Sequence, residues 1–175
     1  MKKLLFIIPL VILLCFAIGC EKEDDDVAEE AKPVVDIEAE KAAVKTLVDE
    51  WMHCFETEDI ETFSNIIAHD PDMVNFGTDA AERWVGWEAL QDSVQKQFAS
   101  TENVIVSTRD QVIFVHKAGE VAWFSMLMDM EGMAQGEAFS LEGMRLTGVF
   151  EKRDANWVIV QIHGSVPVSG QAIEY

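Results

Sequence analysis

Two side chains in the second half of the chain are of the types that general acid/base chemistry uses. Asp129 lies inside the apolar run WFSMLMDM, and His163 lies in the last apolar run, NWVIVQIHGSV. If Asp129 is buried in an apolar pocket, its carboxyl pKa is raised, and with an imidazole nearby the two groups could move protons on a substrate. If Asp129 instead lies at a strand end in water, it simply accepts a hydrogen bond from a strand-edge donor. The sequence leaves both interpretations open.

Other polar residues give weaker indications of chemistry. His69, Asp70 and Asp72 lie in the segment HDPD, which is typical of a helix end and a turn, and zinc would need three or four converging ligands. Cys54 lies beside an apolar helical stripe and is better explained as a small core residue than as a nucleophile. The chain contains no glycine loop of the kind that cradles phosphates. We therefore expect no metal site and no cofactor.

The charge of the chain argues against one class of partner. It contains 13 lysines and arginines against 32 aspartates and glutamates, which gives a net charge of −19. A protein this acidic is repelled by nucleic-acid phosphates and by anionic lipid headgroups. We expect no nucleic-acid partner.

The first residues have the parts of a secretory signal peptide. Lys2 and Lys3 precede an apolar core over residues 4–18. This core is shorter than the roughly 18 to 20 apolar residues that a membrane-spanning helix needs. A permanent transmembrane helix is the less favoured alternative.

The segment AIGC at residues 17–20 resembles the bacterial lipobox, in which a small residue precedes a lipidated cysteine. Gly19 fits the position before Cys20, whereas a bulky leucine precedes Cys15. We expect residues 1–19 to be a signal peptide and Cys20 to be the acylated residue that anchors the protein to a membrane. The alternative is an ordinary secreted protein with a free Cys20.

Residues 20–36 carry a dense run of acids after the expected lipidation site. Such a run has too little apolar surface to offset the entropy of ordering, so we expect a flexible tether. An acidic run at this position also resembles surface-export signals of some bacterial lipoproteins. We expect a lipid-anchored protein of the bacterial cell envelope, at the outer membrane or cell surface in preference to the inner membrane.

The remaining sequence predicts helices followed by an antiparallel sheet. Apolar spacings of three and four residues predict helices over 37–57 and 59–68, and a third helix that Gly86 opens. A short strand at 73–76 is followed by a predicted loop, GTDAAERWV, and four longer strand-like runs lie at 103–116, 120–131, 139–152 and 156–166. This order is typical of the α+β class. We expect one domain over 37–168 and a C-terminal tail over 169–175.

The region 37–168 resembles the nuclear transport factor 2-like superfamily, in its SnoaL-like branch. The resemblance rests on FETEDIETFSNIIAHDPDMVNF, on RWVGWEAL and on RLTGVFEKRDANWVIVQIHGSVP. It implies a cone-shaped, curved antiparallel sheet with three N-terminal helices packed on its concave face. It also implies a pocket inside the cone and a homodimer paired through the sheet.

The superfamily includes ketosteroid isomerase, whose three catalytic groups have no counterparts here. The resemblance places Gly148 where the oxyanion acid belongs, and Trp51 where a tyrosine of the first helix belongs. Phe76 or a neighbour falls at the position of the proton-transferring aspartate. We do not expect steroid isomerisation by that route.

An alignment with the family without gaps implies which strand residues line the cone. It selects Trp123, Ser125, Leu127 and Asp129 on one strand and Gln161, His163 and Ser165 on the last. The family often has a histidine at the place of His163, although a role in supporting Ser165 or the dimer seam is the alternative. Arg145, in the family-like segment RLT, is a candidate to pair with a ligand carboxylate, although its alternation points it away from the cone.

Together these features predict a membrane-anchored lipoprotein whose domain binds a small, largely apolar molecule, without certain catalysis. The expected walls are Trp51, Phe55, Phe76, Trp84, Trp87 and Trp123, and the expected polar contacts are Asp129, Gln161 and His163, with Arg145 and Ser165 as further candidates. About half of the aromatic residues are expected to be plain core. One alternative is a cofactor-independent lyase, isomerase or hydrolase that uses Asp129 and His163 as acid and base. Another is a non-catalytic dimeric assembly domain.

Overall fold

The computed structural model describes residues 34–170 and residue 173. The predicted signal peptide, Cys20 and the acidic tether up to residue 33 lie outside the described residues. None of the described helices is long and apolar enough to cross a membrane.

Three helices form where the apolar spacing predicts them. Helix α1 spans Ile37–Thr57, and the side chain of Asp36 caps it by accepting the backbone N–H of Ala39 at 3.1 Å. Helix α2 spans Ile60–Ile66 and is capped in the same way by Asp59. Helix α3 spans Trp87–Ser100, after Gly86 turns the chain with a positive φ.

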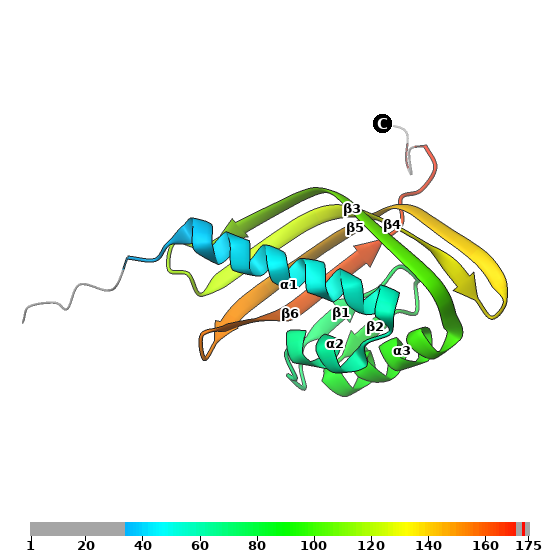
Figure 1. Cartoon of the computed structure of the whole chain (residues 1–175), viewed down its shortest axis with the longest axis horizontal. Coiled ribbons are helices and arrows are strands. Elements are labelled where there is room, and N and C mark those ends of the chain that lie inside the picture. The colour runs from blue at the N-terminus through cyan, green and yellow to red at the C-terminus, as the bar shows by residue number, and fades with distance from the viewer. Residues whose placement is uncertain (1–33, 171–172, 174–175) are drawn as a thin grey trace, which may run out of the picture. The chain divides into compact units, whose positions relative to one another are not determined.

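The strands form one six-stranded sheet in the order β2-β1-β6-β5-β4-β3. The two short strands are β1 (Val74–Phe76) and β2 (Arg83–Val85), and β1 lies parallel to β6. The long antiparallel strands are β3 (Thr101–Val115), β4 (Val121–Ala134), β5 (Glu137–Arg153) and β6 (Asn156–Ser165). All three helices cover one face of this curved, unclosed sheet (Figure 1). The predicted α+β class and the cone-like arrangement are confirmed.

The sheet departs from the sequence prediction in two places. The predicted loop before the third helix contains strand β2, which pairs with β1 through Asn75 and Trp84. Strands β4 and β5 also run further than predicted, because Gln135 and Gly136 turn the chain tightly with positive φ values. A three-residue edge strand carries too little alternation to be recognised from its own sequence.

Bulges give the long strands their curvature. The register of β3 against β4 shifts near Asn103 and Asp110, and both residues have positive φ values. In β6, Gln161 pairs with Val149 while Ile159 pairs with Phe150, so Val160 is an extra residue. This extra residue changes which alternate side chains of β6 face the helices.

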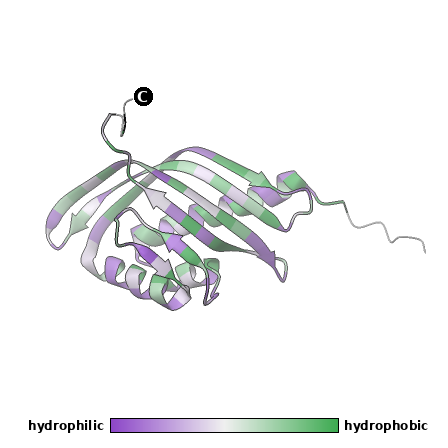
Figure 2. Cartoon of the chain, turned by 180° about the vertical axis from the view of Figure 1, so that it is seen from behind, coloured by the Kyte–Doolittle hydropathy of each residue, from purple (hydrophilic) through white to green (hydrophobic). Residues whose placement is uncertain are grey.

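Alternation on strand β4 is opposite to the one that the resemblance implied. Its buried side chains are Ala122, Phe124, Met126, Met128 and Met130, and these face the helices. Trp123, Ser125, Leu127 and Asp129 therefore lie on the outer face of the sheet. Hydrophobic and hydrophilic residues succeed one another along the strands (Figure 2). The expectation that these four residues line the cone is wrong.

The close packing around Gly148 of β5 allows a test of this fold. A Cβ at this position would lie 2.5 Å from the ring of Phe124 and 2.8 Å from the carbonyl oxygen of Gln161. We expect Gly148→Ala to lower the free energy of unfolding by about 1–3 kcal/mol, because the backbone oxygen has little room to move. Urea unfolding measures the change, and Thr147→Ala on the exposed face of the same strand is the control. Equal stability of the two variants would contradict the packing described.

Candidate functional site

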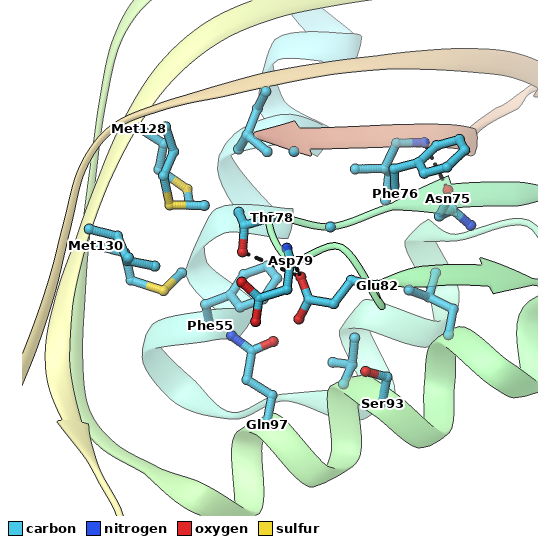
Figure 3. Close-up of a pocket in the computed structure, with 18 of the residues that line it drawn as sticks. Phe55, Asn75, Phe76, Thr78, Asp79, Glu82, Ser93, Gln97, Met128 and Met130 are labelled. Carbon is cyan, nitrogen blue, oxygen red and sulfur yellow. Dashed lines mark hydrogen bonds between the residues drawn. The ribbon is translucent and has the colours of Figure 1, made fainter. Parts of the chain in front are cut away.

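A cavity of about 520 Å³ lies between α1, α3, the β1–β2 segment and the inner face of the sheet. Most side chains that line it are apolar (Figure 3). The apolar ones are Trp51, Met52, Phe55, Phe76, Trp84, Leu90, Val94, Met128, Met130, Ala134, Leu141, Met144, Leu146 and Ile162.

One wall is aromatic and comes from α1. The ring of Trp51 packs edge-on against Phe55 and Phe124, with centroids 6.2 and 6.0 Å apart. Phe55 in turn contacts Phe63 and Phe98, at 6.1 and 5.6 Å. Edge-to-face pairs of this kind fix the rings relative to one another. The indole of Trp51 is therefore held in place by packing on the core.

The opposite wall consists of thioethers from the sheet. Met128 and Met130 point into the cavity from β4, and Met144 faces it from the neighbouring β5, where it pairs with Met128. Methionine side chains have three rotatable bonds and adapt to irregular shapes. This wall can adjust to its occupant, whereas the aromatic wall is fixed.

Asn75 is the buried polar residue of the described core, with 1% of its surface exposed. Its Oδ1 accepts the backbone N–H of Ile162 at 2.8 Å, which joins β1 to β6 (Figure 3). This bond fixes the orientation of the amide, because the nitrogen cannot accept that hydrogen. The Nδ2 group of Asn75 has no hydrogen-bond partner, and Asn75 lines the cavity.

A second buried N–H group without a partner belongs to another lining residue, Trp51. Trp51 is 3% exposed, and its Nε1 group also lacks a partner. Buried N–H groups in folded proteins are nearly always paired with protein or water. Both unpaired N–H groups are buried in the protein beside the cavity, and neither exposes its own surface to it.

The mouth of the cavity is acidic. The Glu82 carboxylate accepts hydrogen bonds from the Thr78 hydroxyl at 3.3 Å and from the backbone N–H of Asp79 at 3.0 Å. Exposed Asp79 and Gln97 lie beside it (Figure 3). A Cβ at Gly77 would lie 2.2 Å from the Glu82 carboxylate and 2.6 Å from the ring of Trp84, so a larger residue there would displace both side chains. Asp79 and Glu82 are the charged residues among the described lining, which contains no lysine, arginine or histidine.

The aromatic residues predicted as walls divide between cavity, core and surface. Trp51, Phe55, Phe76 and Trp84 line the cavity. Trp87 does not, because it stacks behind it on His69, with centroids 4.3 Å apart, and on Phe63. Trp123 lies on the outer face, 42% exposed, and stacks on Phe114. Ligand binding by the four lining residues stays a prediction.

Asp129 lies outside the cavity and is not a buried acid. It forms an ion pair with Arg109 and accepts the backbone N–H of Gly143 at 2.6 Å. The Gly143 N–H and the Arg109 guanidinium lower the pKa of its carboxyl below the ordinary value. Of the two interpretations that the sequence left open, the raised pKa in an apolar pocket is wrong, and Asp129 instead accepts a backbone hydrogen bond from the neighbouring strand.

The predicted acid/base pair is not assembled either. His163 is exposed on the outer face beside the ring of Phe76, and it lies in register with Thr147 and Ser125. Asp129 is four residues further along β4 than Ser125, and strand geometry places it roughly 15 Å from His163. Proton transfer between groups that far apart on an open surface is not possible.

The other predicted contacts also lie away from the cavity. Arg145, Gln161 and Ser165 are absent from its described lining, because on β5 and β6 the cavity receives Leu146, Ile162 and Gly164 instead. The extra residue Val160 shifts the alternation of β6, and an alignment without gaps does not follow that shift.

The residues considered for metal binding or nucleophilic chemistry have structural roles. Asp70 accepts two hydrogen bonds from Arg153, at 2.8 and 2.7 Å, and His69 contacts the carbonyl oxygen of Ser64 at 2.9 Å. Burial raises the thiol pKa of Cys54 to about 11, so the thiol is protonated and unreactive at neutral pH. In the part of the chain that the structure describes, no three potential metal ligands cluster.

Several lining residues were not found by sequence reasoning. Asn75 interrupts the short apolar strand MVNF, and a polar residue at that place was the available signal. Asp79, Glu82 and Gln97 gave no local signal, because a loop and an exposed helix face carry such residues routinely.

Asp129 makes a testable contribution to acid stability. The pKa of the Asp129 carboxyl is lower in the folded protein than its unfolded value of 3.8. The ionised carboxylate therefore stabilises the folded state above pH 3.8, and this stabilisation is lost as the pH falls through the pKa of the folded protein. We expect Asp129→Asn to be less stable than the wild type near pH 7 and equally stable near pH 2. Urea unfolding at both pH values measures this, with Glu131→Gln as a charge-matched control. A constant difference at both pH values would refute the assignment.

Comparisons with known proteins identify the fold and the family. No curated protein matches the chain. A nuclear transport factor 2-like superfamily protein from Salmonella enterica has a similar structure, with 14% identity, a TM-score of 0.69 and coverage of 79% of this chain and 99% of that one. A proposed dehydratase of the same superfamily from Streptomyces avermitilis is 16% identical, with a TM-score of 0.67 and coverage of 75% of this chain and 99% of that one. A proposed aromatic ring hydroxylase from Novosphingobium aromaticivorans is 15% identical, with a TM-score of 0.65 and coverage of 76% of this chain and 94% of that one.

The segment that matches the family begins in the second turn of α1 and includes α2, α3 and the whole sheet. The SnoaL-like domain matches residues 44–169, which is most of the chain and includes every described residue that lines the cavity. The chain therefore belongs to the SnoaL-like domain family.

Proposed function

We propose that this domain binds a small, largely apolar molecule in the cavity between its helices and its sheet. The observation that carries the proposal is the cavity itself, about 520 Å³ in volume and lined mainly by aromatic, aliphatic and methionine side chains. Sites for small molecules are typically concave, about 300–1,000 Å³ in volume and mostly apolar, with a few placed polar groups. A plain structural core would instead be filled to the density of an organic crystal.

Binding fits the lining better than catalysis does. A reaction by general acid/base chemistry needs a proton-transfer group beside the bound molecule. The titratable groups in the described lining are Asp79 and Glu82, both at the mouth. An enzymatic role as a lyase, isomerase or hydrolase would have to use one of these carboxylates, since Asp129 and His163 lie on the outer face.

The proposed setting is the cell envelope, with Cys20 acylated and the acidic segment serving as a tether. The support comes from the sequence: two lysines, a short apolar core and the segment AIGC. Every described helix and strand lies between Ile37 and Ser165.

We also propose that two copies pair through the outer face of the sheet. Phe114 and Trp123 are about half exposed there and stack on one another with ring centroids 5.6 Å apart. Exposed aromatic residues on a sheet face are typical of protein interfaces. The same face would be the contact surface of a non-catalytic assembly domain.

Filling the cavity tests the binding function. Ser93 lines the cavity from α3, whereas Gln95 lies on the exposed face of the same helix. In native mass spectrometry of the fragment Val34–Tyr175 purified from cells, we expect a reproducible added mass that Ser93→Phe abolishes and Gln95→Phe retains. The spectrum also reports whether the fragment is a dimer. The absence of an added mass, together with no binding of the neutral dye Nile red, would refute the proposed function.

Substitution of the two cysteines tests the anchor. We expect Cys20→Ser to move the full-length protein from the membrane fraction to the soluble fraction, because the acyl chains are lost. Cys15→Ser is the matched control and should leave the distribution unchanged. Mass spectrometry of the mature N-terminus detects the acyl chains directly. A membrane-bound Cys20→Ser variant would favour a retained transmembrane segment instead.

A further inference from the structure

We infer that the occupant of this cavity is an amphiphile with an apolar body and a cationic, ammonium-type head, and that the head lies at the mouth beside Glu82 and Asp79. The inference rests on the proposed function and adds the chemical class of the ligand. It is carried by the separation of polar from apolar side chains in the lining, by the charges at the mouth and by an indole ring beside them.

The polar side chains of the lining are concentrated at one end of the cavity. Thr78, Asp79 and Glu82 belong to the loop between β1 and β2, and Gln97 belongs to α3 (Figure 3). Asp79 and Gln97 are exposed, so this end of the cavity is in contact with water. On the sheet the lining consists of buried apolar side chains such as Met128. A ligand that matches both regions has an apolar body and one polar end.

Glu82 has one carboxylate oxygen that remains available to a ligand. Its Oε2 atom accepts the Thr78 hydroxyl and the backbone N–H of Asp79, and these two bonds hold the side chain in place. Its Oε1 atom accepts no hydrogen bond from the described residues, yet it is not one of their buried polar atoms without a partner. The Oε1 atom therefore keeps accessible surface. Since a carboxylate oxygen can only accept, the matching group of a ligand is a donor, and a charged donor forms the stronger bond.

No basic side chain neutralises the two carboxylates. Neither Glu82 nor Asp79 takes part in an ion pair within the described part of the chain. Arg83 follows Glu82 directly, but it is exposed and is absent from the described lining. A cation brought by a ligand would therefore meet two carboxylates that have no counter-ion.

An aromatic ring lies directly beside the Glu82 carboxylate. A Cβ on Gly77 would lie 2.2 Å from Oε2 of Glu82 and 2.6 Å from Cη2 of Trp84, so these two side chains meet at one point. Trp84 is itself a lining residue and is half-buried. Aromatic rings attract cations through the negative potential of their faces, and tryptophan does so most strongly. A cation paired with Glu82 would lie within reach of this ring, and a neutral head would gain less from it.

The position of the head follows from the cost of moving charge out of water. A cation deep in the apolar interior would lose its hydration, whereas at the exposed mouth it keeps water on one side. A carboxylate or phosphate head would be repelled by Asp79 and Glu82 and would find no counter-ion among the described lining. The net charge of −19 also raises the concentration of cations near the protein.

Three probes that share a naphthalene body separate charge from hydrogen bonding. The cation is 2-(2-naphthyl)ethylamine, the neutral donor of the same size is 2-(2-naphthyl)ethanol, and the anion is 2-naphthylacetate. Binding to the fragment Val34–Tyr175, which contains every described helix and strand, is measured by ligand-observed NMR titration near pH 7. We expect the amine to bind about three- to tenfold more tightly than the alcohol, and the carboxylate roughly tenfold more weakly than the amine.

Three variants locate the head, because the ratio of amine to alcohol affinity cancels differences in apolar burial. Glu82→Gln and Asp79→Asn each remove one negative charge and keep the size of the side chain. We expect Glu82→Gln to lower the ratio by about threefold and Asp79→Asn by about twofold. Glu88→Gln is the charge-matched control, because Glu88 is exposed on α3 and is absent from the described lining. It should leave the ratio unchanged.

The outcomes distinguish the inference from the function on which it rests. If the alcohol binds as tightly as the amine or more tightly, the cationic head is overturned and the cavity remains a binding site. The inference also fails if neither mouth variant lowers the ratio more than Glu88→Gln does, because the preference then comes from the charge of the whole protein. If none of the three probes binds, the proposed function itself fails. Should one mouth variant be poorly folded, as judged by circular dichroism, the other decides the result.

Discussion

A side-chain amide reinforces the junction between the two parts of the sheet. Strand β1 pairs with β6 through one register position, Phe76 with His163, and the adjoining bond comes from Asn75, whose Oδ1 accepts the N–H of Ile162. In an ordinary strand pair, a backbone carbonyl would accept the N–H of Ile162. A backbone carbonyl carries no additional donor, whereas the Asn75 amide also has an NH₂ group. With an amide in its place, the sheet is joined and the Nδ2 group is left buried without a partner. This bond and the backbone pairing of Phe76 with His163 together position β1, and with it the loop at the mouth of the cavity.

The cavity exists because the helices do not cover the whole concave face of the sheet. Val44 and Val48 of α1 are fully buried in the core, together with Phe150 and Ile159 of the sheet. Further along, a space remains between the helices and the inner face of the curved sheet, and it is bounded by α3 and by the segment from Gly77 to Glu82. The dense core and the open site therefore share one face of the sheet.

Periodicity in the sequence was sufficient for the class of fold and insufficient for the site. The stripe from Val44 to Phe55 and the alternating runs after residue 100 carry strong signals, and the helices and long strands formed there. On β4 the prediction of which residues face the helices was wrong. The sequence did contain a signal, because Phe124, Met126, Met128 and Met130 are uniformly apolar and the residues between them are not. On β6 the extra residue Val160 reverses the alternation of inward-facing and outward-facing side chains, and no local sequence pattern predicts this reversal. The two unpaired donors follow from tertiary contacts, so only the three-dimensional structure could reveal them.

The unequal stiffness of the two cavity walls determines what kind of selectivity the site can have. On one side, packed rings hold Trp51 and Phe55 in place; on the other, Met128, Met130 and Met144 can change rotamer at small cost. A site of this construction constrains a bound molecule along the aromatic wall and adapts to it along the methionine wall. The ligands of the proposed function would then be a series of molecules that share one flat face and differ in the rest of their carbon skeletons.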